Sequence, residues 1–184
     1  MSVCADKVLR EIEKAAKKEF LPIVGPRRGQ VLVETIHKIK PKHILEVGTL
    51  IGYSTILMAK ELESEAHLIT IEIHADNAKK ARENIGRAEV RPTIDVIVGD
   101  AIKVIPRLKD KFDMVIIDAE KSEYMDYLRL VEDKLHKGSV IVADNAGAAA
   151  DDMKDYLDYV RNSGKYSSEY LPFDGDGVEV SVKL

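Results

Sequence analysis

The segment that most constrains the fold is 44–54, with the sequence ILEVGTLIGYS. A short apolar run is followed by Gly48 and Gly52, which turn the chain sharply into a helical pattern. A buried strand that breaks at glycines and restarts as a helix leaves backbone N–H groups directed at open space. Such groups can bind the polar end of a nucleotide-like cofactor. The segment therefore predicts an α/β fold with a cofactor loop after its first strand.

The rest of the chain repeats this strand-then-helix pattern. Short runs rich in Ile and Val alternate with helical patterns, which is typical of parallel strands covered on both faces. Strands are predicted at 43–47, 68–71, 94–98, 114–117 and 140–143, and helices at about 53–63, 75–87, 101–109, 123–136 and 150–162. Two β-like segments, 166–171 and 178–183, flank the FDGDG turn and predict a terminal antiparallel hairpin. The predicted fold class is a doubly wound α/β sheet.

Residues 1–40 precede the first strand and predict two helices. The first covers 3–20, with apolar side chains at helical spacing at Val8, Ile12, Ala15, Ala16 and Phe20. The segment LPIVGPRRG at 21–29 predicts a break, because it holds two prolines and two glycines. The second helix then runs to Pro41. Because the 184 residues contain no linker or repeat, we expect one domain over 1–184, with these helices ahead of the cofactor-binding core.

Composition excludes several classes of protein. A net charge of −4 gives no reason to expect strong non-specific binding to nucleic acid. No apolar run approaches about 18 residues, so no membrane span is expected. The single Cys4 cannot form an internal disulfide, and charged residues stand where a signal peptide would be apolar. A cytoplasmic location is therefore the expectation.

Acidic residues stand at or just after the ends of five successive predicted strands. They are Glu46, Glu72, Asp100, Asp118 and Asp144. Ligands of open parallel sheets bind beyond these carboxyl ends. Glu72 follows Gly52 by 20 positions, which suits a carboxylate that accepts hydrogen bonds from ribose hydroxyls, although an acid at a strand end can equally cap a helix.

The glycine spacing narrows the cofactor. The E-x-G-x-x-x-G pattern departs from the G-x-G-x-x-G fingerprint, which counts against NAD because it leaves less room for a pyrophosphate. The amino-acid end of S-adenosylmethionine needs only N–H groups and a hydroxyl such as that of Ser54. The pattern therefore favours S-adenosylmethionine.

Asp118, Asp144 and Asn145 form a second constellation. Two carboxylates and an amide oxygen are hard ligands suited to Mg²⁺, although an Asp-Asn pair can also form a turn or a helix cap. The histidines are spread along the chain and predict no zinc site; they are His37, His43, His67, His74 and His136.

Lys121 follows Asp118 at a predicted helix start, where a lysine opposes the helix dipole. Beside a metal and partly buried, its pKa would fall, which makes it a candidate general base. The alternative is an ordinary solvated lysine.

These residues resemble the cation-dependent O-methyltransferases of the catechol and caffeoyl-CoA type. The resemblance covers about 25–183, and the catechol branch looks closest. The shared segments are GPRRGQ, ILEVGTLIGYST, LITIEI, VGDA, VIIDAEKSEY, LHKGSVIVADN and GDGVEV. The resemblance implies an S-adenosylmethionine-binding sheet of seven strands whose last strand is antiparallel.

The resemblance also implies residue roles. Gly48 and Ser54 would hold the methionine end of the cofactor, Glu72 the ribose, and the loop at Asp100 would flank the adenine. Asp118, Asp144 and Asn145 match the metal ligands, and Lys121 matches the catalytic lysine. Glu179 matches an acid that contacts the substrate hydroxyl. The full predicted cofactor set is Glu46, Gly48, Tyr53, Ser54, Glu72, Gly99, Asp100, Ala101 and Asp118.

Two departures from the catechol branch concern the acceptor. Ala119 and Glu120 stand where that branch has a histidine-tryptophan pair, and AGAAADD at 146–152 replaces its proline wall. The aromatic clamp for a flat catechol is therefore missing. The prediction is a Mg²⁺- and S-adenosylmethionine-dependent O-methyltransferase acting on a small vicinal-diol or catechol-like acceptor, with a homodimer left open.

Two alternatives remain at this point. The first is methylation of a hydroxylated tRNA base, with phosphate contacts from Arg27, Arg28, Lys40, Lys42, Arg87 and Arg91. The acidic total charge argues against it. The second is a protein that binds the cofactor without catalysis, which the complete set of ligands and Lys121 argues against.

Overall fold

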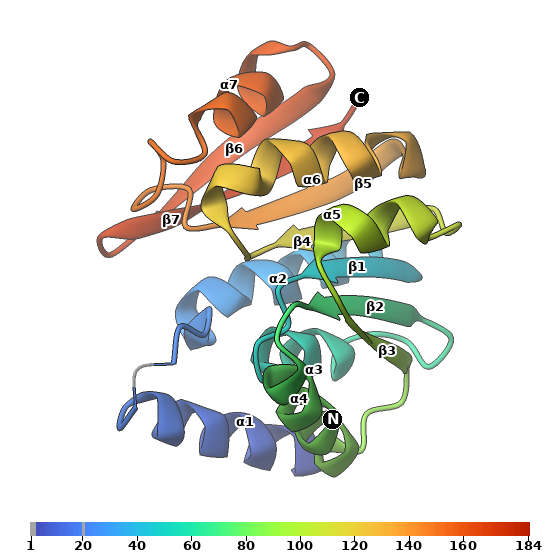
Figure 1. The fold of residues 1–184 in the computed structure, drawn as a ribbon, viewed down its shortest axis with the longest axis vertical. Helices are drawn as coiled ribbons and strands as arrows, with labels where there is room; N and C mark the ends of the chain where they lie inside the picture. The colour runs from blue at the N-terminus through green and yellow to red at the C-terminus, as the bar shows by residue number, and fades with distance from the viewer. Residues whose placement is uncertain (1–2, 20) are drawn as a thin grey trace.

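A seven-stranded sheet forms the centre of the protein in the computed structural model, which describes residues 3–19 and 21–184 (Figure 1). The strand order is β3-β2-β1-β4-β5-β7-β6. The strands are β1 (His43–Val47), β2 (His67–Glu72), β3 (Thr93–Val98), β4 (Phe112–Ile117), β5 (Leu135–Asp144), β6 (Tyr166–Phe173) and β7 (Asp176–Lys183). β1 to β5 pair in parallel, and β7 runs antiparallel between β5 and β6. The predicted fold class and the antiparallel hairpin are confirmed.

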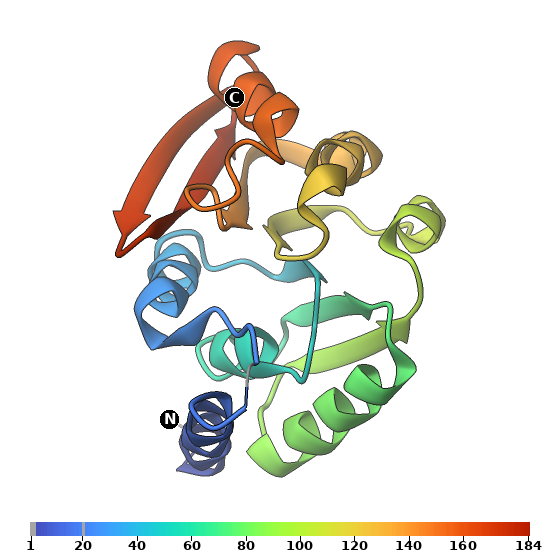
Figure 2. The ribbon, with the colours of Figure 1, turned by 60° about the vertical axis from the view of Figure 1, so that its left-hand side comes forward.

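Helices cover both faces of the sheet, and short 3₁₀ turns extend some of them. The helices are α1 (Val3–Ala16), α2 (Gly25–Ile39), α3 (Tyr53–Ala59), α4 (Ala75–Ala88), α5 (Ala101–Val104), α6 (Tyr124–Val131) and α7 (Lys154–Asn162). The 3₁₀ turns are η1 (Ile105–Arg107), η2 (Lys121–Glu123) and η3 (Glu132–Lys134). Figure 1 shows α5 and α6 in front of the sheet, and Figure 2 shows α1 beside α4 and α3 at the edge away from the hairpin.

The two faces of the central strands carry separate apolar cores. On β1, Leu45 packs with residues of α5, α6 and α7, whereas its neighbour Ile44 packs with residues of α2 and α3. Successive side chains of a strand point to opposite faces, so a strand buried on both sides is apolar at nearly every position, with Glu46 as the buried exception on β1. This explains why short continuous apolar runs predicted the strands well.

The strand order also fixes where a ligand can bind. From β1 the chain adds β2 and β3 on one side, and it then returns to add β4 and β5 on the other side, so the strand order reverses between β1 and β4. The loops that leave the carboxyl ends of these strands diverge there and open a crevice, which is where ligands of such sheets bind.

Several predicted boundaries differ from the structure. α2 begins at Gly25, so the predicted break at 21–29 shortens to 21–24; Pro26 fits the first turn of a helix because no N–H is needed there. α1 ends at Ala16, and Phe20 lies outside the described residues. β5 begins at Leu135, inside the predicted helix 123–136. Within the described ranges, every helix is too short or too polar to span a membrane.

Candidate active site

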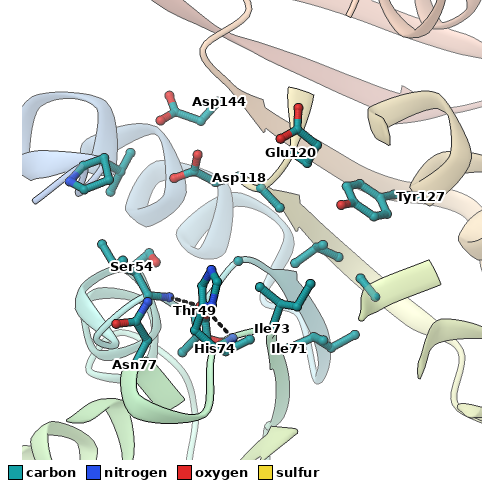
Figure 3. A pocket seen from close by; sticks show the side chains of 18 of the residues that line it. Thr49, Ser54, Ile71, Ile73, His74, Asn77, Asp118, Glu120, Tyr127 and Asp144 are labelled. Atoms are coloured by element: carbon teal, nitrogen blue, oxygen red, sulfur yellow. Dashed lines mark hydrogen bonds between the residues drawn. The ribbon is translucent and has the colours of Figure 1, made fainter. Parts of the chain in front are cut away.

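A cavity of about 740 Å³ opens at the carboxyl ends of the parallel strands (Figure 3). Its volume lies in the range of small-molecule sites. All of the predicted site residues except Glu46 and Glu179 line it, namely Gly48, Tyr53, Ser54, Glu72, Gly99, Asp100, Ala101, Asp118, Lys121, Asp144 and Asn145. Residues predicted from five strand ends therefore meet in one place.

The loop between β1 and α3 needs glycine for two reasons. Gly48 has a φ of 102°, in the left-handed region that favours glycine. A Cβ there would lie only 2.0 Å from the backbone oxygen of Asp118. Any other residue at position 48 would therefore force the loop away from the end of β4. Gly48 therefore brings the cofactor loop against the strand end that carries Asp118.

Glu72 is fixed at the edge of the cavity by two backbone groups. Its Oε2 accepts a hydrogen bond from Leu50 N–H at 2.7 Å, and its Oε1 accepts one from His74 N–H at 2.9 Å. A carboxylate offers about four acceptor positions, so Glu72 can accept further hydrogen bonds from a ligand. The contact with Leu50 also ties the glycine loop to the next strand end.

Glu46 does not reach the cavity. It is fully buried, and it accepts hydrogen bonds from the hydroxyls of Thr55 and Thr70, the latter at 2.6 Å. Burial raises the pKa of its carboxyl. This placement corrects the expectation that Glu46 contacts the cofactor: it joins β1, β2 and α3 beneath the loop.

Asp100 lines the cavity and also caps a helix. Its side chain accepts a hydrogen bond from Ile102 N–H at 2.9 Å and forms an ion pair with Lys103 at 3.0 Å. The hydrogen bond from Lys103 lowers the pKa of Asp100. Asp100 therefore caps α5 and also lines the cavity. The helix-cap interpretation, which the sequence left open for acids at strand ends, applies here.

Asp144 is the most exceptional acid of the site. Its side chain is almost fully buried, and Oδ1 receives no hydrogen bond. Arg28 lies 3.1 Å from Oδ1 as an ion pair, but without hydrogen-bond geometry. Burial, and then the negative charge of Asp118, raise the pKa of Asp144 to about 7. Figure 3 shows the Asp118 and Asp144 carboxylates turned toward the same side.

Asn145 completes this oxygen-rich set. Its φ of 61° lies in the left-handed region, which Asn tolerates better than most residues. Its Nδ2 donates to Asp176 Oδ2 at 2.6 Å, and no described residue donates to its Oδ1. The amide is therefore held at its nitrogen and leaves its oxygen available as a ligand.

Lys121 contacts Asp118 directly, and it contacts the backbone of Asp144 through the hydroxyl of Tyr124. Its Nζ is 3.0 Å from Asp118 Oδ1 and donates to Tyr124 OH, also at 3.0 Å. The Tyr124 hydroxyl in turn donates to the backbone oxygen of Asp144 at 3.2 Å. Burial raises the pKa of Tyr124 well above its ordinary value, and the Asp118 and Asp144 charges add to this. Lys121 is thus fixed in the cavity and is not a freely solvated lysine.

Glu179 does not line the cavity, which corrects the expectation that it meets the acceptor. It is fully buried, and its two carboxylate oxygens accept hydrogen bonds from Arg161 at 3.0 and 2.6 Å. On β7, Val178 pairs with Asp144 and Glu179 pairs with Ala143. Adjacent strand residues face opposite sides, so Glu179 faces α7 while Asp144 faces the cavity.

Sequence reasoning missed part of the lining. Arg28 pairs with both Asp144 and Asp176, although its segment GPRRGQ was among those shared with the family. Other lining residues that were missed include Pro22, Ile23 and Val24 of the 21–24 connection, Ile73, His74 and Asn77 after β2, and Glu123 and Tyr127 after Lys121. Of these, Arg28, Ile73 and Glu123 lie in segments shared with the family (GPRRGQ, LITIEI and VIIDAEKSEY), which could have indicated them.

Comparisons with known proteins agree with this geometry. The profile of the O-methyltransferase family matches residues 1–158. Catechol O-methyltransferase B of Danio rerio is 36% identical over 180 residues, covering 91% of this chain and 67% of that protein. The catechol O-methyltransferase of Sus scrofa is 34% identical over 178 residues, covering 90% of this chain and 95% of that protein. A solved O-methyltransferase from Bacillus cereus, in complex with SAH, aligns with a TM-score of 0.87 at 27% identity, covering 97% and 91% of the two chains.

Proposed function

Because this chain belongs to the O-methyltransferase family and is an S-adenosylmethionine-dependent enzyme similar to catechol O-methyltransferases, we propose that it methylates a hydroxyl of a small vicinal-diol or catechol-like acceptor with the help of a divalent cation. The observation that carries this proposal is the buried Oδ1 of Asp144, which no group hydrogen-bonds. A buried acceptor that receives no hydrogen bond costs about 1–3 kcal/mol, and a bound cation would offset this cost beside the ion pair that Oδ1 forms with Arg28.

The residues present fit a hard cation. Asp118, Asp144 and Asn145 offer two carboxylates and an amide oxygen, which are ligands that Mg²⁺ prefers. The arrangement leaves the cavity side open for water and for two adjacent acceptor oxygens. When bound, such an ion supplies Lewis acidity that lowers the pKa of an acceptor hydroxyl.

The opposite part of the cavity is proposed to bind the cofactor. In this proposal Glu72 accepts hydrogen bonds from the ribose hydroxyls, and the N–H groups of the Gly48 loop, together with Ser54, bind the methionine end. Gly99, Asp100 and Ala101 flank the base. The methyl donor and the acceptor then share one cavity, so positioning for in-line transfer supplies a large part of the rate.

Lys121 is proposed to take the acceptor proton at Nζ. Its amine lies beside Asp118 Oδ1 and Tyr124 OH, both at 3.0 Å. These two groups would stabilise the ammonium that forms when Nζ accepts the proton. The same contacts keep Nζ at the side of the cavity where Asp144 lies.

The acceptor is the least constrained part of the proposal. Ala119 and Glu120 line the cavity where the catechol branch carries an aromatic pair, so selection would depend on two neighbouring oxygens more than on a flat ring. A tRNA acceptor is not favoured, because three of the arginines that could contact phosphates pair with acids of this chain: Arg27 with Asp174, Arg28 with Asp144 and Asp176, and Arg87 with Glu11.

Removal of the cation tests the proposal. We expect EDTA, or the variant Asp144→Asn, to reduce methyl transfer by about 1,000-fold or more, because several kcal/mol of charge stabilisation are lost. Binding of S-adenosylmethionine, measured by calorimetry, should change little. The control is Asp152→Asn, an exposed acid outside the cavity. Full activity under both treatments would contradict the cation mechanism.

An acceptor screen tests the substrate class. Labelled S-adenosylmethionine would be offered with vicinal diols, catechols or tRNA, with and without Mg²⁺. We expect transfer to the small acceptors only, and only with the ion. Transfer to tRNA with a steep loss of affinity on adding salt would replace the small-molecule acceptor with a nucleic acid.

A further inference from the structure

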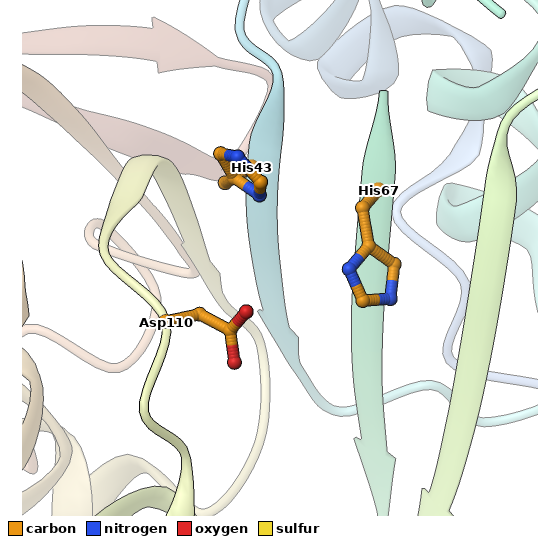
Figure 4. Close-up of side chains that lie close together, drawn as sticks. All are labelled: His43, His67 and Asp110. Atoms are coloured by element: carbon orange, nitrogen blue, oxygen red, sulfur yellow. The ribbon is translucent and has the colours of Figure 1, made fainter. Parts of the chain in front are cut away.

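Two histidines and an aspartate come together at the end of the sheet opposite the cavity. His43 begins β1, His67 begins β2, and Asp110 lies in the loop before β4 (Figure 4). Each can offer a ligand atom, and these atoms all lie within 4.8 Å of one another. The two histidines are directly paired in the parallel register of β1 and β2. The sequence predicted no zinc site because the histidines are spread along the chain, but strand pairing brings His43 and His67 together although 24 positions separate them.

His67 is oriented for metal binding by a neighbouring carboxylate. Its Nε2 lies 2.7 Å from Asp95 Oδ2, a residue of β3. Asp95 therefore holds the ring proton on Nε2 and leaves the lone pair on Nδ1. Histidines that bind metals almost always donate their other ring N–H to a carboxylate or carbonyl in this way. Figure 4 shows one ring nitrogen of His67 turned toward the side where His43 and Asp110 lie.

The other two ligands have no competing contacts. Among residues 3–19 and 21–184, no side chain or backbone group forms a hydrogen bond or ion pair with the His43 ring or with the Asp110 carboxylate. By contrast, nearby Asp113 accepts hydrogen bonds from two backbone N–H groups and from His136. The three side chains are therefore adjacent without stabilising each other by a direct bond.

We propose that His43, His67 and Asp110 bind a divalent transition-metal ion of the Zn²⁺ class. Imidazole nitrogens suit Zn²⁺, Ni²⁺ or Co²⁺, whereas Mg²⁺ prefers oxygen ligands alone. Ligand atoms in a tetrahedral Zn²⁺ site lie about 3.3 Å apart, given bond lengths of about 2.0–2.2 Å. The cluster must therefore contract by up to about 1.5 Å, toward which the exposed His43 ring can rotate. Water would fill the fourth position.

This site is independent of the proposed methyl transfer. Gly48, in the cavity loop, follows His43 by five residues along β1, which corresponds to about 16 Å, so an ion at His43 cannot touch an acceptor in the cavity. It would instead link β1 and β2 to the loop that precedes β4. Because only the folded chain aligns the three ligands, the ion should raise the melting temperature by about 5 °C at concentrations near 100 times its Kd.

Calorimetric titration of metal-free protein with Zn²⁺ tests the site. We expect a saturable event that is lost in His67→Gln and in Asp110→Asn but kept in Asp144→Asn, which alters only the oxygen-ligand set in the cavity. Asp95→Asn should weaken this event by about 10–100-fold, because the ring of His67 is no longer oriented. His37→Gln, an exposed histidine elsewhere, is the matched control.

Two results would overturn the proposal. One is zinc binding by His67→Gln equal to that of the unmodified protein. The other is the loss of all zinc binding in Asp144→Asn, which would assign the ion to the cavity. An unchanged affinity in Asp95→Asn would contradict the orienting role of that carboxylate. Circular dichroism and the melting temperature in EDTA show whether each variant is folded.

Discussion

Asp113, at the amino ends of the strands, is more exposed than Asp144 at their carboxyl ends, yet it is far better hydrogen-bonded. Asp113 accepts from Lys42 N–H at 2.7 Å, from His43 N–H at 2.9 Å and from His136 at 2.8 Å. Asp144 has a side-chain exposure of 6% against 30% for Asp113, and its Oδ1 has no hydrogen-bond donor. The acid that most needs partners has fewer of them.

The pKa values follow the same contrast. Burial alone would raise the pKa of Asp113, but hydrogen bonds from His43 N–H and His136 lower it. At Asp144 burial dominates and the pKa rises to about 7. At the amino ends of the strands, Asp113 is therefore fully hydrogen-bonded by groups of this chain. At the carboxyl ends, Asp144 has an oxygen that could bind a ligand. A buried polar group that receives no hydrogen bond calls for an explanation, and a bound ion is one such explanation at Asp144.

The largest effect that tests this contrast is expected from Lys121→Met. Removal of the proton acceptor should lower kcat by about 10²–10⁴-fold, because general base catalysis contributes that much. The free energy of unfolding and cofactor binding should change little. The matched control is Lys137→Met, an exposed lysine at the amino end of β5. Equal activity of the two variants would show that Lys121 is no more than a surface lysine.

A smaller effect, on stability, distinguishes the glycines of the two ends. Gly48→Ala should reduce the free energy of unfolding by about 3 kcal/mol, because the new Cβ would meet the Asp118 backbone and φ is positive. Gly138→Ala, at the amino end, also has a positive φ but has open space around it. It should cost about 1 kcal/mol.

Urea denaturation measures both glycine variants. Equal losses would mean that backbone conformation alone decides the cost, and that the close approach of the loop to β4 is unimportant. A larger loss in Gly138→Ala would reverse the comparison between the two ends.

The smallest effect concerns pH and His136. The Lys137 carbonyl, and then Asp113, raise the pKa of His136 above 6.5. A raised histidine pKa stabilises the fold fully below the unfolded pKa and loses this contribution as pH rises through the folded pKa. Because the pair is largely exposed, the contribution should stay below about 1 kcal/mol. In the unmodified protein the urea midpoint should therefore fall as the pH rises from about 5.5 to about 8.5, and in His136→Gln this fall should be smaller. An unchanged slope would contradict the pairing.

The sequence was sufficient where burial or chain direction dictates residue type. Strands such as β1 are buried on both faces, so their apolar runs were recognisable. Parallel strands all end at one edge, so the order of strands and helices along the chain is enough to place the acids that follow them together. This reasoning located Glu72, Asp118 and Asp144 in one cavity.

The sequence was not enough to place a side chain whose position depends on strand register or on a partner far along the chain. Glu46 and Glu179 were expected to contact ligands, but neither lines the cavity: Glu46 is buried against Thr55 and Thr70, and Glu179 lies on the strand face that packs against α7. Arg28 enters the site through ion pairs with residues more than a hundred positions away. His43 and His67 meet only because β1 and β2 pair in register.

The hydrogen bonds from Lys121 Nζ to the Tyr124 hydroxyl, and from that hydroxyl to the Asp144 carbonyl, form a rigid spacer. Because burial raises the pKa of Tyr124, the phenol keeps its proton near neutral pH. The two hydrogen bonds therefore couple the positions of Lys121 and Asp144 without moving a proton between them. If the end of β5 shifts, the Lys121 amine shifts with it. The separation between the amine and the Asp144 strand end is therefore set by two hydrogen bonds that meet at one hydroxyl oxygen.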